Sequence, residues 1–430
     1  MKLKRFLKNN LLLKVTSTNA LVVFVRLSFS IISQKVLAIY IGAEGIALVG
    51  NFKNITGFFT QFSTLGSFNG LVKHISEFKN DKTELNKLFS TTLVFILIAS
   101  VISFIVLFFG SDYLNDILFG VEKDYSFVFK ILSFIVPFMG LSAMFNGLIN
   151  GISAYKTYSK ITIVTIVFST VLIVLFTLLN NIKGSLFAIA LIPLIQFLSA
   201  LFFFSNQLKK YINLKQLSLK LLYKNKLFSY SIMTLITVLS INYTDIAIRK
   251  MIEINVGVND AGYWTAMTSI SNNYMNFSAI IFPLYILPKY SVMTSSLQFR
   301  KEIVHIYKMI LPLFVIGMVL IFLFKNSIIK LLYTDNFMEM SSLFKWQLIG
   351  DFVKLIALVI AYQFLAKKQL IFFVLTEVFS VILFYMFSKY FIPIYGVEGV
   401  VLAHFVRYVL YFILVLFILR HKLFGKERVL

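Results

Sequence analysis

Residues 160–180 read KITIVTIVFSTVLIVLFTLLN, in which the first lysine is followed by twenty residues without a charged side chain. A helix of about 20 apolar residues crosses the roughly 30 Å hydrocarbon core of a bilayer, so this stretch predicts a transmembrane helix. Similar runs recur throughout the 430-residue chain, which is 59% hydrophobic and only 14% charged. Its mean hydropathy is +0.86. This composition excludes a soluble globular protein and predicts an all-α polytopic membrane protein.

Glycine, proline, asparagine and clusters of charge separate the apolar runs. The pattern predicts twelve spans, at residues 15–41, 46–72, 89–110, 127–149, 160–180, 185–205, 228–252, 263–288, 303–324, 346–366, 370–391 and 399–419. The longest connection follows the sixth span and carries six lysines. We therefore expect two lobes of six helices, at residues 1–208 and 228–430, joined by a basic cytoplasmic linker at 209–227.

The basic residues predict the orientation of the chain in the membrane. On this set of spans, 26 Lys and Arg residues fall on the side of both termini and five on the other side. Cytoplasmic connections carry the excess of Lys and Arg, so we expect both termini in the cytoplasm. This topology also accounts for most of the formal charge of +23, which makes nucleic acid an unnecessary partner.

Several chemistries are excluded by what the sequence does not contain. With no cysteine, the chain has no disulfide, thiol nucleophile or cysteine-ligated metal, and His74, His305, His404 and His421 lack metal-ligand spacing. No nucleotide-binding or hydrolase motif is present, and no connection is long enough to hold a soluble active site. We therefore expect a secondary transporter rather than an enzyme, with no catalytic residue, metal or cofactor. The basic start is expected to lead into an uncleaved first helix.

Ten basic residues lie inside or at the ends of the spans, where they are costly in hydrocarbon. Five lie near enough to a span end to reach the interface: Lys35, Lys130, Lys250, Lys308 and Lys389. The other five need a wet cavity, a partner or a function: Arg26, Lys53, Arg249, Lys354 and Arg407.

Embedded acids are fewer. Asp245 and Arg249 are four residues apart, and Asp351 and Lys354 are three apart, so each pair shares a helix face and can neutralise itself. Either pair could be a structural ion pair or part of a working site. The third embedded acid is Glu377.

Two spans carry a polar or small stripe at helical spacing: Gly50, Asn54, Gly57 and Gln61, and Thr265, Ser269, Asn272 and Asn276. Such stripes line a hydrated cavity or hold helices in close contact, and their combination with embedded basic residues that lack an acidic neighbour in the sequence favours a cavity. Prolines within or at the ends of spans permit kinks: Pro137, Pro193, Pro283, Pro288 and Pro312.

Several segments resemble a known family over nearly the whole chain. They are Gly42-Ala-Glu-Gly45 with Asn51-Phe-Lys53, Phe68-Asn-Gly70, Ile248-Arg-Lys250, Gly262-Tyr-Trp264 with Ser269-Ile-Ser271, Tyr285-Ile-Leu-Pro288, and Trp346-Gln-Leu-Ile-Gly-Asp351 with Lys354. Their number and order resemble the polysaccharide repeat-unit flippases, which include O-antigen translocases and the lipid III flippase. These belong to the multidrug/oligosaccharidyl-lipid/polysaccharide exporter (MOP) superfamily.

The resemblance implies a MATE-like exporter fold, with two six-helix lobes that open alternately to each side of the membrane. It implies transport of an undecaprenyl-pyrophosphate-linked oligosaccharide from the cytoplasmic to the periplasmic leaflet, in the synthesis of O-antigen, hence lipopolysaccharide, or a related surface polysaccharide. Membrane lipids surround such a protein. The resemblance implies a place in a bacterial inner membrane, with a polymerase and a chain-length regulator as candidate partners in this pathway, and we expect a monomer.

Basic residues in a low-dielectric cavity favour an anion such as a pyrophosphate. We therefore expect Arg26, Lys53, Arg249 and Lys354 to bind substrate, with Lys35 and Arg407 as weaker candidates and Asp351 as the resting partner of Lys354. Any proton or sodium coupling would use Asp245, Asp351 or Glu377, with Glu377 the first candidate.

Two other functions remain open. A multidrug exporter of the same superfamily would need an acidic, aromatic cavity for cationic drugs. A polysaccharide polymerase would usually have a large basic periplasmic loop, whereas the longest predicted periplasmic connections here, 111–126 and 325–345, are modest.

Overall fold

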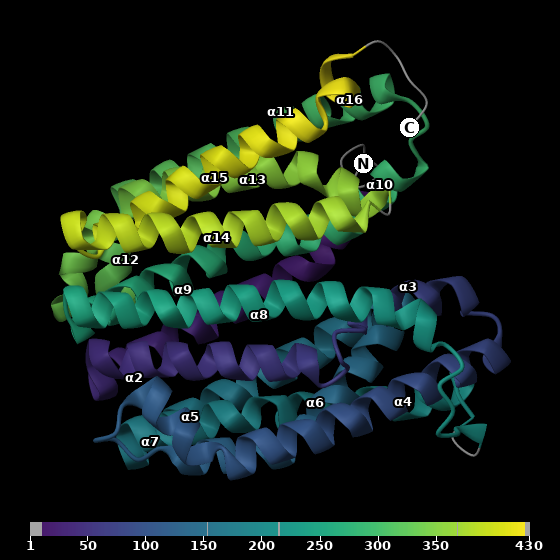
Figure 1. The fold of residues 1–430 in the computed structure, drawn as a ribbon, viewed down its shortest axis with the longest axis horizontal. Helices are drawn as coiled ribbons and strands as arrows, with labels where there is room; N and C mark the ends of the chain where they lie inside the picture. Colours follow the sequence, from purple (N-terminus) through teal and green to yellow (C-terminus); the bar gives the residue numbers. More distant parts are fainter. Residues whose placement is uncertain (1–10, 153, 214–215, 368, 426–430) are drawn as a thin grey trace, which may run out of the picture. The chain divides into compact units, whose positions relative to one another are not determined.

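The structure is a computed structural model that describes residues 11–152, 154–213, 216–367 and 369–425. Within these ranges every regular element is a helix (Figure 1). The chain forms two compact units, which we call the first unit (18–41 and 48–246) and the second unit (42–47 and 247–430, with the first residues of α2). Their boundary falls inside helix α8, and the lobes expected at 1–208 and 228–430 remain a prediction.

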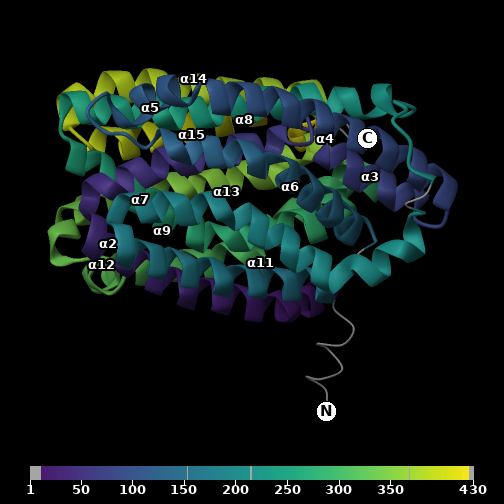
Figure 2. The same cartoon turned by 90° about the horizontal axis from the view of Figure 1, so that it is seen from below.

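Most of α2 and α8 and all of the helices between them form the first unit. They are α2 (Leu11–Phe62), α3 (Phe68–Phe78), α4 (Lys82–Phe104), η1 (Ile105–Phe109), α5 (Ser111–Phe119), α6 (Ser126–Gly151), α7 (Tyr155–Tyr211) and α8 (Lys224–Asn255). Helix α6 packs against α3, α4 and α7 (Figures 1 and 2). Leu88, Phe89, Leu148 and Phe204 form part of the core at these contacts.

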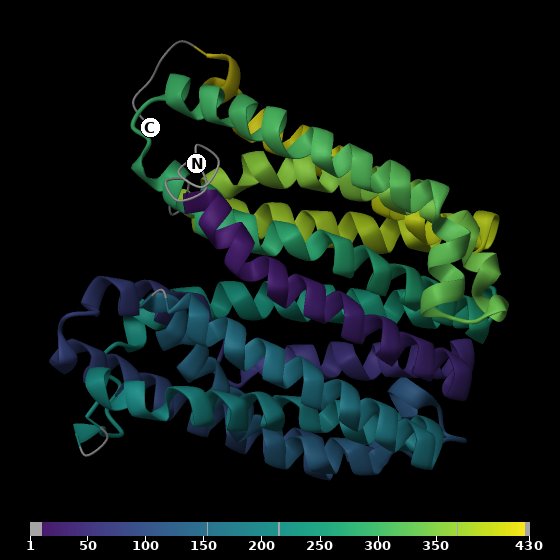
Figure 3. The ribbon, with the colours of Figure 1, turned by 180° about the vertical axis from the view of Figure 1, so that it is seen from behind.

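The second unit is formed by the C-terminal helices. They are α9 (Val258–Ile281), η3 (Phe282–Ile286), α10 (Leu287–Val292), α11 (Ser296–Leu323), α12 (Lys325–Leu332), η4 (Asp335–Leu343), α13 (Phe344–Ala366), α14 (Leu370–Tyr395), α15 (Glu398–Ile418) and α16 (Arg420–Phe424). Helix α15 packs on both α13 and α14, and α11 contacts α13 and α16. Figure 3 shows α11, in green, with its first residues near α16.

The expected number of spans is confirmed in the described part of the chain. Nine helices are long and apolar enough to cross a bilayer. Two of these helices, α2 and α7, each contain two helical segments joined at a break. The break lies at Gly42 in α2 and at Asn180 and Asn181 in α7. Helix α9 adds one more segment of 24 residues, whose Ser, Thr and Asn content lowers its hydropathy. The result is twelve membrane-spanning segments in a multi-pass membrane protein.

The non-helical breaks lie at glycine and asparagine, although one expected kink position, Pro283, falls in the π-helical segment η3. Gly42 has a φ of 63°, a conformation that costs glycine little, whereas Pro137 lies inside α6 with no non-helical residue recorded beside it. The second span was predicted to reach residue 72, but α2 ends at Phe62. Leu65 and Gly66 both have positive φ and end the helix before α3 begins.

The polar stripe of the second span lies at a helix contact in the first unit. The Asn54 amide donates to the Asn242 carbonyl at 3.4 Å, and a Cβ added to Gly57 would lie 3.6 Å from the Asn242 Oδ1 atom. At these two positions the stripe therefore packs against α8, which favours the packing interpretation.

The connection between α7 and α8 is held against α4 by side chains on one face of that helix. The Asn86 Oδ1 atom accepts from the Asn213 amide at 3.0 Å, and Ser90 and Thr91 accept from the Ser218 and Tyr223 amides, each at 3.1 Å. The Tyr223 hydroxyl donates to Glu84. Burial and this hydrogen bond raise the pKa of the Tyr223 hydroxyl, so it remains a donor at neutral pH.

We expect Asn86→Ala to loosen this connection. The substitution leaves the Asn213 amide without its acceptor and removes the 3.0 Å hydrogen bond from Asn86 to Gln216. Asn213 and Gln216 are exposed, so water can replace the lost partner, and the substitution should cost about as much as an ordinary hydrogen bond, about 0.5–1.5 kcal/mol. Hydrogen exchange at residues 213 and 216–223 should therefore be roughly 2- to 12-fold faster. Asn255→Ala is the control, because the exposed Asn255 amide bonds only within its own helix, to the Met251 carbonyl. Equal exchange in the two variants would contradict the prediction.

Candidate functional site

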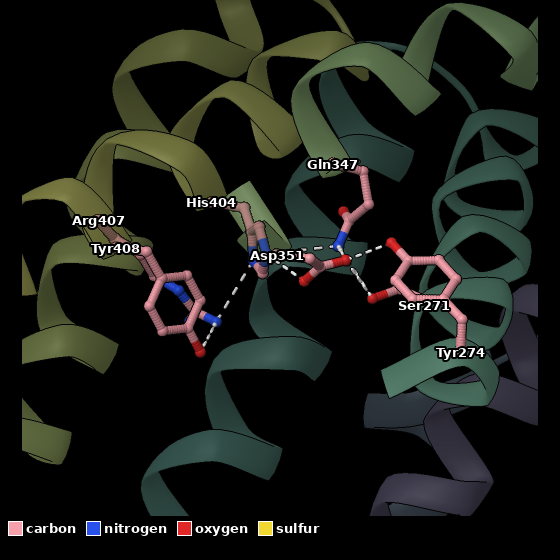
Figure 4. A network of polar contacts seen from close by, with 7 residues as sticks. All are labelled: Ser271, Tyr274, Gln347, Asp351, His404, Arg407 and Tyr408. Carbon is pink, nitrogen blue, oxygen red and sulfur yellow. Dashed lines mark hydrogen bonds and ion pairs between the residues drawn. The ribbon is translucent and has the colours of Figure 1, made fainter. Parts of the chain in front are cut away.

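A buried carboxylate, Asp351 on α13, is the centre of a polar network in the second unit (Figure 4). Its Oδ2 atom accepts hydrogen bonds from the Ser271 hydroxyl at 2.6 Å, the Tyr274 hydroxyl at 2.5 Å and the Gln347 amide at 3.1 Å. Its Oδ1 atom lies 3.0 Å from the His404 Nε2 atom. Four partners from three helices thus satisfy a carboxylate that has no exposed surface.

The network continues from His404 to Arg407 on α15. The Arg407 guanidinium donates to the His404 Nδ1 atom at 3.4 Å and to the Tyr408 hydroxyl at 3.0 Å. Since arginine can only donate, Nδ1 must accept and Nε2 must carry the proton given to Asp351. The imidazole in this arrangement is neutral and links the buried carboxylate to the guanidinium.

Arg407 is also held between two aromatic rings. Its Cζ atom lies 4.1 Å from the ring centroid of Phe384 and 4.4 Å from that of Tyr408. Cation–π contacts of this kind are worth about 2 kcal/mol or more when they are desolvated. The Nε atom is buried and has no hydrogen-bond partner in the described structure, so the guanidinium retains an unused donor.

Helical spacing places these residues on facing surfaces. Gln347 and Asp351 are four residues apart on α13, and Ser271 and Tyr274 are three apart on α9. Residues at these spacings share one face of a helix. On α15, His404 shares a face with Arg407, Tyr408 and Tyr411. Each of the helices α9, α13 and α15 therefore has its polar residues on one face, and these three faces meet in the network.

Gly350 allows α13 and α15 to approach closely enough for the network to form. A Cβ atom at this position would lie 2.5 Å from the His404 ring and 3.2 Å from the backbone of Phe405. Only glycine fits here without displacement. The segment Trp346-Gln-Leu-Ile-Gly-Asp351 therefore supplies the carboxylate, one of its donors and the space for its histidine partner.

We expect Gly350→Ala to displace His404 from Asp351. Overpacking of a well-packed site costs about 1–3 kcal/mol, and the thermal unfolding midpoint of the purified protein should fall accordingly. Gly317→Ala is a matched control, because a Cβ there meets no atom within 4 Å. If both glycine variants unfold at the wild-type temperature, the close approach does not constrain the network.

Lys354 and Glu377 lie beside this network. The Lys354 ammonium is 5.5 Å from the ring centroid of Tyr408, and the Tyr411 hydroxyl donates to Glu377 at 3.1 Å. Asp351 was expected to hold Lys354, but no Asp351–Lys354 ion pair within 4 Å is found among the described residues, and the carboxylate is hydrogen-bonded to His404 instead. The reason is geometric, because the His404 ring lies across the helix contact and reaches the carboxylate directly.

Arg249, near the end of α8, is buried against α9 of the same unit. It is 4% exposed, its Nε atom donates to the Thr265 hydroxyl at 2.9 Å, and its Cζ atom lies 5.3 Å from the Trp264 ring centroid. The Trp264 ring is 6.5 Å from Phe384, which covers Arg407. Two aromatic rings therefore lie between the two guanidinium groups.

The remaining predicted residues lie in the first unit and outside this network. Arg26, Lys35 and Asp245 are half-buried, whereas Lys53 is exposed. No hydrogen bond or ion pair is found for Arg26 among the described residues. Some basic residues counted for the orientation lie outside the described residues: Lys2, Lys4, Arg5, Lys8, Lys215, Lys368, Lys426 and Arg428.

Sequence reasoning identified Lys354, Asp351, Glu377 and Arg407 but assigned no role to His404, Tyr274 or Gln347. One signal for His404 was available. It lies three residues before Arg407 in an otherwise apolar span, so the two polar side chains share a helix face.

The chain is similar to proteins named as lipid flippases and as multidrug resistance transporters. A family described as "Polysaccharide biosynthesis protein" matches residues 12–294. The chain is 26% identical to the lipid III flippase of Escherichia coli (strain K12), over 93% of this chain and 96% of that relative. This relative and the proteins of similar structure described below are named as flippases or transporters rather than enzymes.

Two solved structures show the same fold. An inward-facing multidrug resistance MATE transporter of the MOP superfamily has a TM-score of 0.74 at 15% identity, over 93% of this chain and 98% of that one. The lipid II flippase MurJ, in an inward closed conformation, has a TM-score of 0.68 at 15% identity, over 94% of this chain and 87% of that one. The expected MATE-like exporter fold is confirmed. Because the family match spans more than half of its residues, the chain belongs to the polysaccharide biosynthesis protein family, and its fold is that of the MOP superfamily.

Proposed function

We propose that this membrane protein is a flippase for a lipid-linked oligosaccharide. It would move an undecaprenyl-pyrophosphate-linked repeat unit from the cytoplasmic to the periplasmic leaflet of a bacterial inner membrane, for O-antigen or a related surface polysaccharide. The similarity to a lipid III flippase over 93% of this chain supports this substrate class. The excess of basic residues on the side of both termini supports their cytoplasmic location.

The observation that carries the proposal is the pair of arginines held by aromatic rings in the second unit. Arg249 is stacked on Trp264, and Arg407 lies between Phe384 and Tyr408 with an unused buried donor. Lys354 adds a second positive charge beside Arg407. Where water is excluded, such groups bind phosphate oxygens strongly and repel cationic drugs. An anionic glycolipid therefore suits this site better than a cationic amphiphile.

In this proposal the substrate passes between the two lobes by alternating access. Arg26, Lys53 and Lys35 would bind substrate from the first unit, and Arg249, Lys354 and Arg407 from the second. Asp351 would hold the His404–Arg407 arrangement in position rather than bind the substrate, because it is fully buried and its four partners already satisfy it.

Alanine variants of Arg26, Lys53, Arg249 and Lys354 test this function in cells. Each variant replaces the chromosomal copy, and surface glycan is measured after the membrane level of the variant protein has been confirmed. We expect glycan assembly to fail in these variants. Near-normal glycan in all four would refute the basic binding site.

For ion coupling, we expect Glu377→Gln to change the response of transport to an ion gradient. Glutamine keeps the oxygen that accepts from Tyr411 but cannot carry the charge that a bound proton or sodium ion would neutralise. Glycolipid transport in proteoliposomes is compared with and without a proton or sodium gradient, in wild type, Glu377→Gln and Asp351→Asn. If neither substitution alters the gradient response, coupling does not use these acids.

A further inference from the structure

The connection between α7 and α8 presents leucine side chains outward beside lysines. Leu219 is 74% exposed, Leu222 57% and Leu221 39%. Other apolar residues in and next to the same connection are buried in the core of the first unit, among them Ile212, Tyr223 and Leu227. The exposed leucines therefore belong to a segment whose other apolar side chains are packed in the core.

The backbone that carries these leucines is fixed. Side chains of Asn86, Ser90 and Thr91 accept from its amides at Asn213, Ser218 and Tyr223, so the segment is attached to α4 at both ends and in the middle. The leucines consequently point away from α4 as part of a built surface. We call this surface the linker face and define it by Leu219, Lys220, Leu221, Leu222, Lys224 and Lys226, all of which are exposed.

The charge of the linker face has one sign. Lys220, Lys224 and Lys226 are exposed. Lys209 and Lys210, at the end of α7, are exposed as well. The sequence contains no Asp or Glu from residue 125 to residue 244. On the neighbouring α4, Glu84 already binds Lys87 and the Tyr223 hydroxyl. Lys226 lies over the rings of Tyr223 and Phe78 and is within electrostatic reach of Glu84. No ion pair is found for Lys220 or Lys224 among the described residues, so these two lysines in particular retain capacity for another anion.

The position of this surface suggests what covers it. It lies where α7 ends and α8 and α4 begin, and the ends of membrane spans lie at the depth of the lipid headgroups. Leucines beside lysines at that depth match a monolayer with apolar chains below and anionic phosphates above. Orientation by the positive-inside rule explains the lysines but does not explain the exposed leucines.

We propose that the linker face binds anionic phospholipid, with the leucines inserted at the headgroup boundary and the lysines against the phosphates. The connection between the two halves of the chain is thereby seated on the membrane surface. This inference does not depend on the transported substrate. Each lysine near an anionic surface should increase binding about fivefold, so three should together contribute about a hundredfold.

The absence of cysteine from the chain makes the test direct. A nitroxide spin label is attached at Leu221→Cys in the full-length protein, and its access to oxygen and to a water-soluble nickel complex is measured in nanodiscs. One set of nanodiscs contains phosphatidylcholine only and the other adds phosphatidylglycerol. The control label is at Val121→Cys, because Val121 is 83% exposed and lies beside Glu122.

We expect the label at 221 to lie at lipid depth and to move deeper when phosphatidylglycerol is present, whereas the label at 121 stays unchanged. Replacing Lys220, Lys224 and Lys226 with glutamine should remove the response to phosphatidylglycerol. A label at 221 as open to nickel as the one at 121, in both lipids, would overturn the proposal and indicate a surface for a protein partner. A glutamine variant whose label still moves deeper when phosphatidylglycerol is added would refute the role of the lysines.

Discussion

Asp351→Ala is expected to lower the thermal unfolding midpoint of the purified protein by about 6 to 20 °C. Each buried hydrogen-bond donor left without an acceptor costs about 1–3 kcal/mol, so the loss of a shared acceptor should cost about 3–5 kcal/mol in all, because the groups left behind cannot return to water. Here the substitution would strand His404, Ser271, Tyr274 and Gln347, which share a single acceptor residue.

The control for Asp351→Ala is Asp335→Ala in the same unit. Asp335 is 83% exposed and pairs with Lys330 at 3.7 Å, and exposed pairs of this kind contribute about 0–1 kcal/mol. Asp351→Asn should fall between the two, because it keeps the side-chain shape but replaces one acceptor oxygen by a donor. If Asp351→Ala and Asp335→Ala unfold at the same temperature, the network does not stabilise the second unit.

Arg407→Ala is expected to lower glycolipid binding and transport by about 30-fold or more. Loss of one partner in a desolvated charged contact costs about 2–5 kcal/mol. Arg407→Lys should restore only part of the activity, because a lysine keeps the charge but not the close contacts of the guanidinium with the Phe384 and Tyr408 rings. Partial activity of Arg407→Lys would show that the site needs the guanidinium group itself and not only a positive charge.

Arg420 provides the matched control for this series. It also stacks on an aromatic ring, with its Cζ atom 4.3 Å from the Phe417 centroid, but it is exposed and donates only to the Phe417 carbonyl. Arg420→Ala should transport as wild type does. Equal transport by Arg407→Ala and Arg420→Ala, at equal membrane levels, would remove Arg407 from the proposed site.

The sequence predicts the twelve spans well because each depends on local composition. Hydropathy and length decide whether a segment crosses a bilayer, and the breaks at Gly42 and at Asn180 and Asn181 coincide with the expected ends of spans. The boundary errors have local causes that hydropathy does not report. The early end of the second span, for example, follows from the positive φ angles of Leu65 and Gly66.

The partners of the embedded charges could not be predicted in the same way. Spacing along one helix suggested that Asp351 pairs with Lys354, three residues away. The observed partner, His404, is 53 residues away on α15, and it reaches Asp351 only because Gly350 lets the two helices meet. Contacts between helices depend on packing, which a single sequence does not specify.

In the proposed function, the arginines of the second unit recognise an anionic glycolipid. This recognition is tested most directly by binding of an undecaprenyl-pyrophosphate-linked oligosaccharide to the purified protein in nanodiscs, in wild type and Arg249→Ala, with a cationic drug as competitor. We predict binding to the wild type that the drug does not reduce and that Arg249→Ala loses. Drug binding without glycolipid binding would contradict the account and would indicate a multidrug exporter in which these arginines only pack helices together.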